Sequence, residues 1–484
     1  MNPAVKSPLW TAAEAAAATG GRPSGTWSAS GVSIDSRSLQ PGDLFVALQG
    51  PNFDGHDFVA AALRNGAAAA VASRVPEDVP AGAPLLLVAD TTDALRALGQ
   101  AARGRSAARF AAVTGSVGKT GTKEALKLAL EAQAPTFASS GNLNNHWGVP
   151  LSLARMPRDV AYGVFELGMN HAGEIGPLSR LVRPEVALIT TIEAVHLEFF
   201  PSVKAIADAK AEIFEGMTPD GVAVLNRDNP QFDRLAAKAR DRGISRILAF
   251  GRHEEADARL IDCSAHPTHS AVTAEILGRR VVYDLAMPGL HWAVNSLGAL
   301  AAAAAMGGEI DAAAAAMARL TPLKGRGRRE RVVLPGGPIE LIDESYNASP
   351  VAVRAAIQVL GQAQPGVGGR RIAVLGDMLE LGAEAERLHA DLAPDLRAAR
   401  VDLVFTAGRL MAALHEALPA SQRASHATDS AGLRDDLLAA VRPGDVVLVK
   451  GSLGSRMSPL VEALRALGRP ESDHATPRHA ANGT

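Results

Sequence analysis

Short runs of apolar residues along the chain alternate with segments whose apolar positions recur at helical spacing. In the first hundred residues these runs lie at 44–48, 67–72 and 85–89, and polar, glycine-bearing loops lie at 31–37 and 50–56. Runs of this length between such loops predict β-strands that alternate with helices. We therefore expect a small N-terminal α/β domain over residues 1–105.

The apolar pattern becomes longer and more continuous beyond this region. Apolar runs, each followed by a helical pattern, lie at 110–114, 163–167, 186–191, 222–225 and 247–250, and alanine-rich helical segments follow at 297–305 and 312–317. Continuous apolar strands that alternate with helices are typical of a mostly parallel sheet covered on both faces. The pattern predicts a central α/β domain over residues 106–320.

A basic segment punctuated by glycine and proline, residues 321–331, predicts a linker. After it the alternation starts again, with apolar runs at 339–342, 372–375, 403–406 and 446–449. These predict a third, doubly wound, Rossmann-like domain over residues 321–467. The last segment, 468–484, has no periodicity and is expected to be a disordered tail.

Composition narrows the classes of protein that fit. The 484 residues are 47% hydrophobic and 4% aromatic, with a net charge of −2 and one cysteine. Cys263 alone excludes an internal disulfide framework and a cysteine-rich zinc site. The near-zero charge argues against nucleic-acid binding, and the longest apolar run, 297–306, is half a membrane span. We expect a cytoplasmic monomer with no membrane insertion.

A glycine-rich turn follows the first apolar run of the central region. Residues 111–120 read Ala-Ala-Val-Thr-Gly-Ser-Val-Gly-Lys-Thr, and a helical pattern follows at 123–131. Small residues let backbone N–H groups converge on phosphate oxygens, and a helix N-terminus favours negative charge. In such loops the lysine reaches the β- and γ-phosphates and the hydroxyl binds Mg²⁺.

The loop is a variant, because Val113 stands where the usual spacing places glycine. An ordinary turn between a strand and a helix is the alternative interpretation. The adjacent Gly-Lys-Thr favours ATP binding, and the residues expected to bind it are Gly115, Ser116, Val117, Gly118, Lys119 and Thr120.

Two polar residues follow later strands of the same region. Glu166 and His196 stand at the strand ends where ligands bind in an open α/β sheet. A carboxylate there can complete a Mg²⁺ shell begun by Thr120. A capping glutamate and a structural histidine are the alternatives. Lys210 lies in a helical pattern, where composition alone indicates a solvated surface lysine.

Polar residues also follow three strands of the third region, at 343–350, 376–382 and 449–456. Their shared position at strand ends predicts one cleft, although each segment by itself could be an ordinary loop. The linker adds Arg326, Arg328, Arg329 and Arg331. These arginines are either solvated or, at a hinge beside an ATP site, phosphate clamps.

Together these segments resemble the Mur ligase family of ATP-dependent amide-forming enzymes. The variant phosphate loop, the Glu166 strand, His196-Leu-Glu, the Ala-Lys-Ala-Glu segment around Lys210 and His291 four residues before Asn295 occur in that family's order. More specific strings lie at 33–37, 42–48, 54–58, 141–145, 343–350, 376–382 and 450–457. The resemblance covers roughly residues 30 to 465.

The resemblance implies a three-domain enzyme with a UDP-muramoyl-substrate domain, an ATPase and a domain that closes over the site. It implies that ATP and Mg²⁺ support the joining of D-Ala-D-Ala to UDP-MurNAc-tripeptide. The tripeptide carboxylate would attack the γ-phosphate to form an acyl phosphate, which the D-Ala-D-Ala amine would then attack. Positioning and charge neutralisation would supply most of the catalysis.

Residue by residue, the resemblance implies that Lys119 and Thr120 contact phosphate and Mg²⁺, and that Glu166 and His196 bind Mg²⁺. It implies that Lys210 is carbamylated and binds a second Mg²⁺ through its added oxygens. The nucleotide contacts that it implies are Asn295 for adenine, Arg326 for the γ-phosphate and Asp343 for ribose or phosphate. The residues expected to act in catalysis are Lys119, Lys210, His196 and Arg326.

The remaining positions concern the other substrates. The expected substrate contacts are Ser36, Arg37, Asn142, Asn144, Asn145, Asn347, Asp377 and Lys450. The string Gly-Arg-Gly-Arg-Arg at 325–329 leaves Arg326 and Arg328 as alternatives for the γ-phosphate. Trp147 stands where a smaller aliphatic residue is expected.

Other activities share the same ATPase core. A sister ligase that adds the third residue, or a folylpolyglutamate synthetase, would differ in the amine that it accepts. A P-loop regulatory ATPase would not need the cleft of the third region. A kinase would release a stable phosphorylated product.

Overall fold

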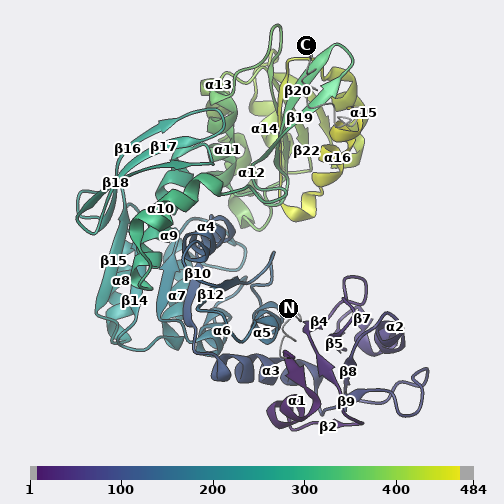
Figure 1. Cartoon of the computed structure of the whole chain (residues 1–484). Coiled ribbons are helices and arrows are strands. Elements are labelled where there is room, and N and C mark those ends of the chain that lie inside the picture. The colour runs from purple at the N-terminus through teal and green to yellow at the C-terminus, as the bar shows by residue number, and fades with distance from the viewer. Residues whose placement is uncertain (1–7, 469–484) are drawn as a thin grey trace, which may run out of the picture.

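The apolar runs form three main sheets, which follow one another from the purple N-terminal end to the yellow C-terminal end of Figure 1. The structure, a computed structural model, describes residues 8–468. Most neighbouring strands in these sheets run parallel, with helices in the connections. The expected α/β class is therefore confirmed.

The N-terminal sheet has five strands in the order β2-β9-β8-β5-β4. Its inner pairs are parallel, and only β2 runs antiparallel to its neighbour. The elements of this region are β1 (Trp10–Thr11), α1 (Ala12–Thr19), β2 (Arg22–Pro23), β3 (Ser28–Ala29), β4 (Gly31–Ser33), β5 (Asp43–Val46), β6 (Gln49–Gly50), β7 (Phe53–Asp54), α2 (Val59–Arg64), β8 (Ala69–Ala72), β9 (Leu85–Leu87) and α3 (Thr91–Arg105).

The central sheet has nine strands in the order β11-β12-β10-β13-β14-β15-β16-β17-β18. Its elements are β10 (Arg109–Thr114), α4 (Lys119–Glu131), β11 (Thr136–Ala138), α5 (Gly148–Arg155), β12 (Tyr162–Glu166), α6 (Ile175–Val182), β13 (Val186–Ile189), α7 (Val203–Ala211), β14 (Val222–Asn226), α8 (Phe232–Asp241), β15 (Arg246–Gly251), β16 (Ala258–Ala265), β17 (Ser270–Ile276), β18 (Arg279–Leu285), α9 (Leu290–Ala305) and α10 (Ile310–Ala316). One face packs against α4, α9 and α10, and the other against α5 to α8. Both faces are thus covered, as the continuous apolar strands require.

The expectation that a helix follows the run at 247–250 is wrong. Three further strands, β16 to β18, extend the sheet there, and the last two pairs are antiparallel. Buried and exposed positions alternate along β18, because one face of this extension meets solvent. A search for continuous apolar runs misses strands of this kind, since their pattern has a period of two.

The C-terminal sheet has six strands in the order β19-β20-β24-β21-β22-β23. Its elements are β19 (Arg328–Leu334), β20 (Gly337–Glu344), α11 (Pro350–Gln362), β21 (Arg371–Gly376), α12 (Ala385–Ala390), α13 (Ala393–Ala398), β22 (Leu403–Ala407), α14 (Met411–Ala417), β23 (Arg423–Ala427), α15 (Ser430–Ala440), β24 (Val446–Lys450) and α16 (Ser458–Ala466).

The predicted linker at 321–331 is too long. Its last residues, from Arg328 onward, belong to β19, which pairs antiparallel with β20. The sequence pattern did not predict β19, because the strand contains charged residues. Their side chains form ion pairs with the neighbouring strand β20, such as Arg329–Glu340 at 2.7 Å. The edge strand β23 was likewise not predicted, since it is mostly polar.

The domain boundaries near residues 105 and 320 stay a proposal, which the separate sheets support. No helix within residues 8–468 is both long enough and apolar enough to cross a membrane. The predicted disordered tail lies, apart from its first residue, outside the described residues.

Candidate active site

The glycine-rich turn joins β10 to α4, which begins at Lys119, four residues earlier than the sequence pattern indicates. Gly118 adopts a φ of 83°, and a Cβ atom there would lie 2.6 Å from Nδ2 of Asn295. Gly115, with a φ of 147°, would place a Cβ atom 1.9 Å from Oγ1 of Thr190. Both positions therefore require glycine.

Lys119 lies folded back over this loop. Its Nζ donates hydrogen bonds to the carbonyl oxygens of Gly115, at 2.8 Å, and Ser116, at 3.4 Å. Burial lowers the pKa of Lys119, although the negative charge of Glu166 acts in the opposite direction. A phosphate would offer this ammonium group stronger, charge-assisted partners than the loop carbonyls.

Glu166, at the end of β12, is held in place by neutral partners. Its Oε1 accepts a hydrogen bond of 2.8 Å from Nδ2 of Asn144, and its backbone N–H donates to Oγ of Ser139 at 3.1 Å. Its buried Oε2 has no hydrogen-bond partner within residues 8–468. A buried carboxylate oxygen without a partner is costly unless a cation binds it.

These residues fit Mg²⁺, which is commonly bound by one or two carboxylates together with substrate phosphates and water. Glu166, Thr120 and His196 all line one cavity. The described part of the chain places no cluster of three or more His, Cys, Asp or Glu side chains for a metal ion. Further ligands would therefore have to come from substrate, solvent or a modified side chain.

Ser139 stabilises the fold through Glu166, so we predict that Ser139→Ala lowers the free energy of unfolding. The substitution leaves the buried N–H of Glu166 without an acceptor, at a cost of about 1–3 kcal/mol. Urea denaturation of the purified protein measures the difference. Ser140→Ala is the matched control, because Ser140 is exposed, and an equal effect of the two substitutions would contradict the prediction.

His196 follows β13 and adopts a φ of 56°, in the left-handed region. Its Nδ1 hydrogen-bonds to Oε2 of Glu380, which lies in the loop after β21 of the C-terminal region. Burial lowers the pKa of His196, whereas the neighbouring Glu380 carboxylate raises it. The ring therefore stands where the central and C-terminal regions touch.

Lys210 is buried, with 1% of its surface exposed, which contradicts the interpretation from composition that it is solvated. Burial shifts the pKa of its amine well below the ordinary value, and the positive charge of Lys119 adds to the shift. Helix α7 hides the side chain because Ile206, Ala207 and Ala209 pack into the core beside it. An amine of this kind is uncharged more readily than a surface lysine.

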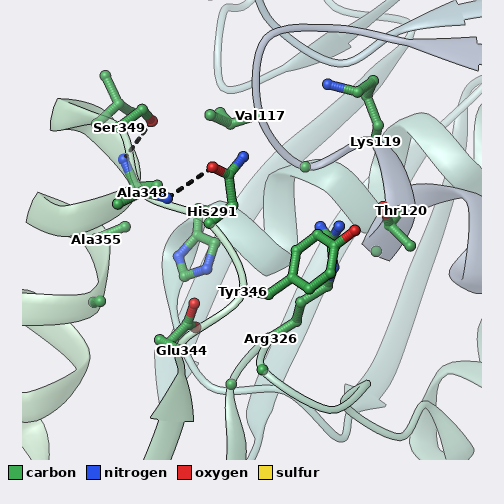
Figure 2. Close-up of a pocket in the computed structure, with 18 of the residues that line it drawn as sticks. Val117, Lys119, Thr120, His291, Arg326, Glu344, Tyr346, Ala348, Ser349 and Ala355 are labelled. Carbon is green, nitrogen blue, oxygen red and sulfur yellow. Dashed lines mark hydrogen bonds between the residues drawn. The ribbon is translucent and has the colours of Figure 1, made fainter. Parts of the chain in front are cut away.

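The C-terminal region supplies the opposite wall of the cavity. Figure 2 shows Arg326 and Tyr346 of this wall beside Thr120, and Glu344 next to His291. The guanidinium carbon of Arg326 lies 4.3 Å from the centroid of the Tyr346 ring. Lys450 is buried, and its Nζ lies 3.1 Å from Oε2 of Glu344 and 2.9 Å from the Asn347 carbonyl oxygen. This wall thus presents the half-buried guanidinium of Arg326 and the Lys450–Glu344 ion pair.

A cavity of about 330 Å³ lies between the two walls. The predicted site residues that line it are Ser116, Val117, Gly118, Lys119, Thr120, Asn142, Asn144, Glu166, His196, Asn295, Arg326, Asn347 and Lys450. Arg328 does not line it; its side chain is half exposed and pairs with Glu330. The geometry therefore favours Arg326 over Arg328.

Several predicted residues lie away from this cavity. Ser36 and Arg37 belong to the N-terminal region, where Arg37 pairs with Asp35 at 2.7 Å. Asn145 accepts hydrogen bonds from backbone N–H groups at the start of α5, and Asp377 does the same at the start of α14. Gly115 and Lys210 do not line the cavity either.

Asp343, the predicted ribose or phosphate contact, is also directed elsewhere. Its carboxylate accepts hydrogen bonds from the Ser345 hydroxyl at 2.6 Å and from the Gly325 N–H at 3.2 Å. The next residue, Glu344, lines the cavity instead. Side chains alternate between the two faces along β20, so the residue next to the predicted one points to the opposite face. The prediction was therefore displaced by one residue.

The cavity residues that were not predicted as contacts include His291, Trp292, Glu344 and Tyr346. Glu344 and Tyr346 stand inside the predicted segment 343–350, and His291 and Trp292 open the helix that carries Asn295. Only their position beside predicted residues could have indicated, from the sequence, that they line the site. Trp292 packs over Gly121 of α4, where a Cβ atom would lie 2.5 Å from its ring.

Comparison with known proteins matches most of the chain to one family. Family models match in series: Mur ligase family, catalytic domain, over residues 28–103; Mur ligase middle domain over 113–303; and Mur ligase, glutamate ligase domain, over 327–453. The UDP-N-acetylmuramoyl-tripeptide–D-alanyl-D-alanine ligase of Escherichia coli is 37% identical over 442 residues, which are 90% of this chain and 94% of that one. This chain belongs to the Mur ligase family.

Solved Mur ligase structures agree with this assignment. MurF from Acinetobacter baumannii is 32% identical, with a TM-score of 0.82 over 95% of this chain and 99% of that chain. MurF ligase from Thermotoga maritima, in complex with ADP, is 28% identical, with a TM-score of 0.73 over 90% of this chain and 97% of that chain. The resemblance to the Mur ligase family is thereby confirmed.

Proposed function

We propose that this chain joins D-Ala-D-Ala to UDP-MurNAc-tripeptide at the expense of ATP, giving the pentapeptide precursor of peptidoglycan, ADP and phosphate. The strongest support is that similarity to ligases of this name runs through the regions of all three sheets and over nine tenths of both chains. A shared ATPase core alone would match only the central region. Because ATP and UDP-MurNAc-tripeptide are nucleotides, we propose that the enzyme acts in the cytoplasm.

The phosphate loop would hold the triphosphate of ATP. Backbone N–H groups around Gly118 and the N-terminus of α4 would bind its oxygens, and Lys119 would leave the loop carbonyls for the β- and γ-phosphates. Asn295, close to Gly118, would contact the adenine. The ADP bound to the Thermotoga maritima ligase supports a nucleotide at this site.

Mg²⁺ would be held by Thr120, Glu166 and His196, and Lys210 as a carbamate would contribute to a second ion. Bound magnesium would offset the negative charge that develops during phosphoryl transfer. Glu166 suits this role because its buried Oε2 has no partner among the described residues. Lys210 suits carbamylation because its lowered pKa favours the neutral amine, which is the form that adds to CO₂.

The reaction would proceed in two steps. The terminal carboxylate of the tripeptide attacks the γ-phosphorus, and the bond to the β-phosphate oxygen breaks to release ADP. The amine of D-Ala-D-Ala then attacks the carbonyl carbon of the acyl phosphate, and inorganic phosphate leaves. Lys119 and Arg326, from opposite walls of the cavity, would neutralise the anions that meet in the first step.

The C-terminal wall would bind the incoming dipeptide. Asn347 and the buried Lys450 would contact it, and the segment around Asp377 would shape the same side. Walls from two regions would also keep water from the acyl phosphate, which water would hydrolyse. In the N-terminal region, Ser36 and Arg37 would contact the UDP-sugar.

Phosphate release from a panel of substrates tests this proposal. Purified protein with ATP, Mg²⁺ and UDP-MurNAc-tripeptide should release phosphate only when D-Ala-D-Ala is added, and mass spectrometry should detect the amide product. Release that depends on a diamino acid or on glutamate would instead indicate a sister ligase or a folylpolyglutamate synthetase. A stable phosphorylated product without an amide would indicate a kinase.

Substitution of two arginines that lie close together in the sequence tests which of them contacts the γ-phosphate. We predict that Arg326→Ala lowers kcat/KM about a thousandfold, as loss of a transition-state arginine does in phosphoryl transfer. Arg328→Ala should retain activity, because Arg328 is half exposed and lies outside the cavity. Steady-state kinetics compare the two variants, and a larger loss in Arg328→Ala would reverse their assignment.

A further inference from the structure

Two loops from different sheets meet at the edge of the cavity. The loop after β13 carries His196, and the loop after β21 carries Glu380. Besides the hydrogen bond between their side chains, the backbone N–H of Glu198 donates to the Glu380 carbonyl oxygen at 3.3 Å. The contact therefore joins the central and C-terminal regions through both side chain and backbone.

Both residues adopt an uncommon backbone conformation. His196 has a φ of 56° and Glu380 a φ of 64°. Non-glycine residues in this left-handed region are infrequent, and they cluster at ligand clamps and active sites. Here each residue is held so that its side chain meets the other across the junction of two sheets.

We propose that Glu380 is a positioning residue, which orients His196 for metal binding only when the two loops are in contact. The proposal rests on the proposed role of His196 as a Mg²⁺ ligand. With Nδ1 bonded to the carboxylate, Nε2 is the ring nitrogen left for a metal, and it bonds to no residue within 8–468. A carboxylate on the far nitrogen of a metal-binding histidine fixes the tautomer and the orientation of the ring.

Glu380 acts through His196 and is not itself a ligand, because it does not line the cavity, whereas His196 does. A simple surface ion pair is a weaker explanation. The side chains are 22% and 38% exposed, and pairs of such exposure contribute little to stability. Removal of the carboxylate should therefore change metal affinity much more than it changes the melting temperature.

The consequence is that the metal site depends on the arrangement of two regions. When the C-terminal region moves away, the His196 ring loses the acceptor that fixes it. Metal affinity at this ligand should then fall, so that Mg²⁺ is bound tightly only in the arrangement where Arg326 and Lys450 also face the phosphate loop.

Mn²⁺ binding to the full chain, in the presence of a non-hydrolysable ATP analogue, tests the proposal by electron paramagnetic resonance. Glu380→Ala should weaken Mn²⁺ binding about tenfold or more. Glu380→Gln should recover most of the affinity, because an amide oxygen still accepts the Nδ1–H. Glu384→Ala is the matched control; its carboxylate is more exposed and pairs with Arg387.

Spin-echo modulation from a coordinated imidazole nitrogen gives a second readout. The signal should be strong in the wild type, absent in His196→Ala and weakened in Glu380→Ala, with melting temperatures close to that of Glu384→Ala. Glu380→Ala that binds Mn²⁺ like Glu384→Ala, or a Gln variant as weak as the Ala variant, would overturn the proposal. An unchanged signal in His196→Ala would instead refute the metal role of His196 in the proposed function.

Discussion

Lys119→Ala should lower kcat/KM for ATP about a thousandfold, which corresponds to about 4 kcal/mol of lost transition-state stabilisation. Lys119 is the positive group of the phosphate loop, and its Nζ lies within hydrogen-bond distance of two loop carbonyls. Alanine would leave the charge developing between the β- and γ-phosphates without this partner. Arg326 lies on the other wall of the same cavity, so it would not restore the contact that Lys119 makes at the loop.

Coupled measurement of ADP release, together with thermal denaturation, checks this prediction. Lys127→Ala is the matched control, since Lys127 is on the same helix but is more than a third exposed and pairs with Glu131. The control should retain activity, and both variants should melt near the wild type. A kcat/KM for Lys119→Ala equal to that of the control would refute the assignment of the phosphate loop.

The second large effect concerns Lys210. We expect Lys210→Ala to lose most activity, on the order of a hundredfold or more, because the substitution would remove the proposed carbamate ligand of a metal ion. Small carboxylic acids such as formate or acetate should restore part of the activity, since their oxygens can occupy the space of the carbamate. Turnover at increasing concentrations of added acid measures the rescue.

Lys204→Ala provides the control on the same helix, because Lys204 is exposed. It should be active and indifferent to added acid. A fully active Lys210→Ala would end the proposal of a catalytic lysine. An inactive variant that no acid rescues would leave Lys210 with a structural role in the core.

Much of the fold could be predicted because the inner strands of the sheets are buried on both faces. The strands β10, β12 and β13 are continuous apolar runs, and each was located to within about two residues. The strands β18, β19 and β23 were missed, because exposed edge positions and ion pairs place charged residues in them. Pairing with a neighbour, which the sequence does not display, decides the structure of such segments.

The candidate site was predicted best where a motif fixes the backbone. Residues of the phosphate loop and Glu166 line the cavity. Each follows a parallel strand, and the carboxyl ends of these strands lie at the same edge of the sheet. Asp343 and Glu344 show the limit, since a shift of one residue along a strand exchanges the buried and the cavity side. The burial of Lys210 depends on packing between distant segments, and composition cannot indicate it.

The cavity has a consequence for how the enzyme is made. One wall comes from residues near 120 and the other from residues near 345 and 450. At about 5–20 residues per second, a growing chain would complete the phosphate loop on the order of tens of seconds before Lys450 is synthesised. Because the phosphate loop packs against Thr190 and Asn295, the nucleotide side of the cavity is complete only after residue 295 is made, and Lys450 is added only near the end of translation.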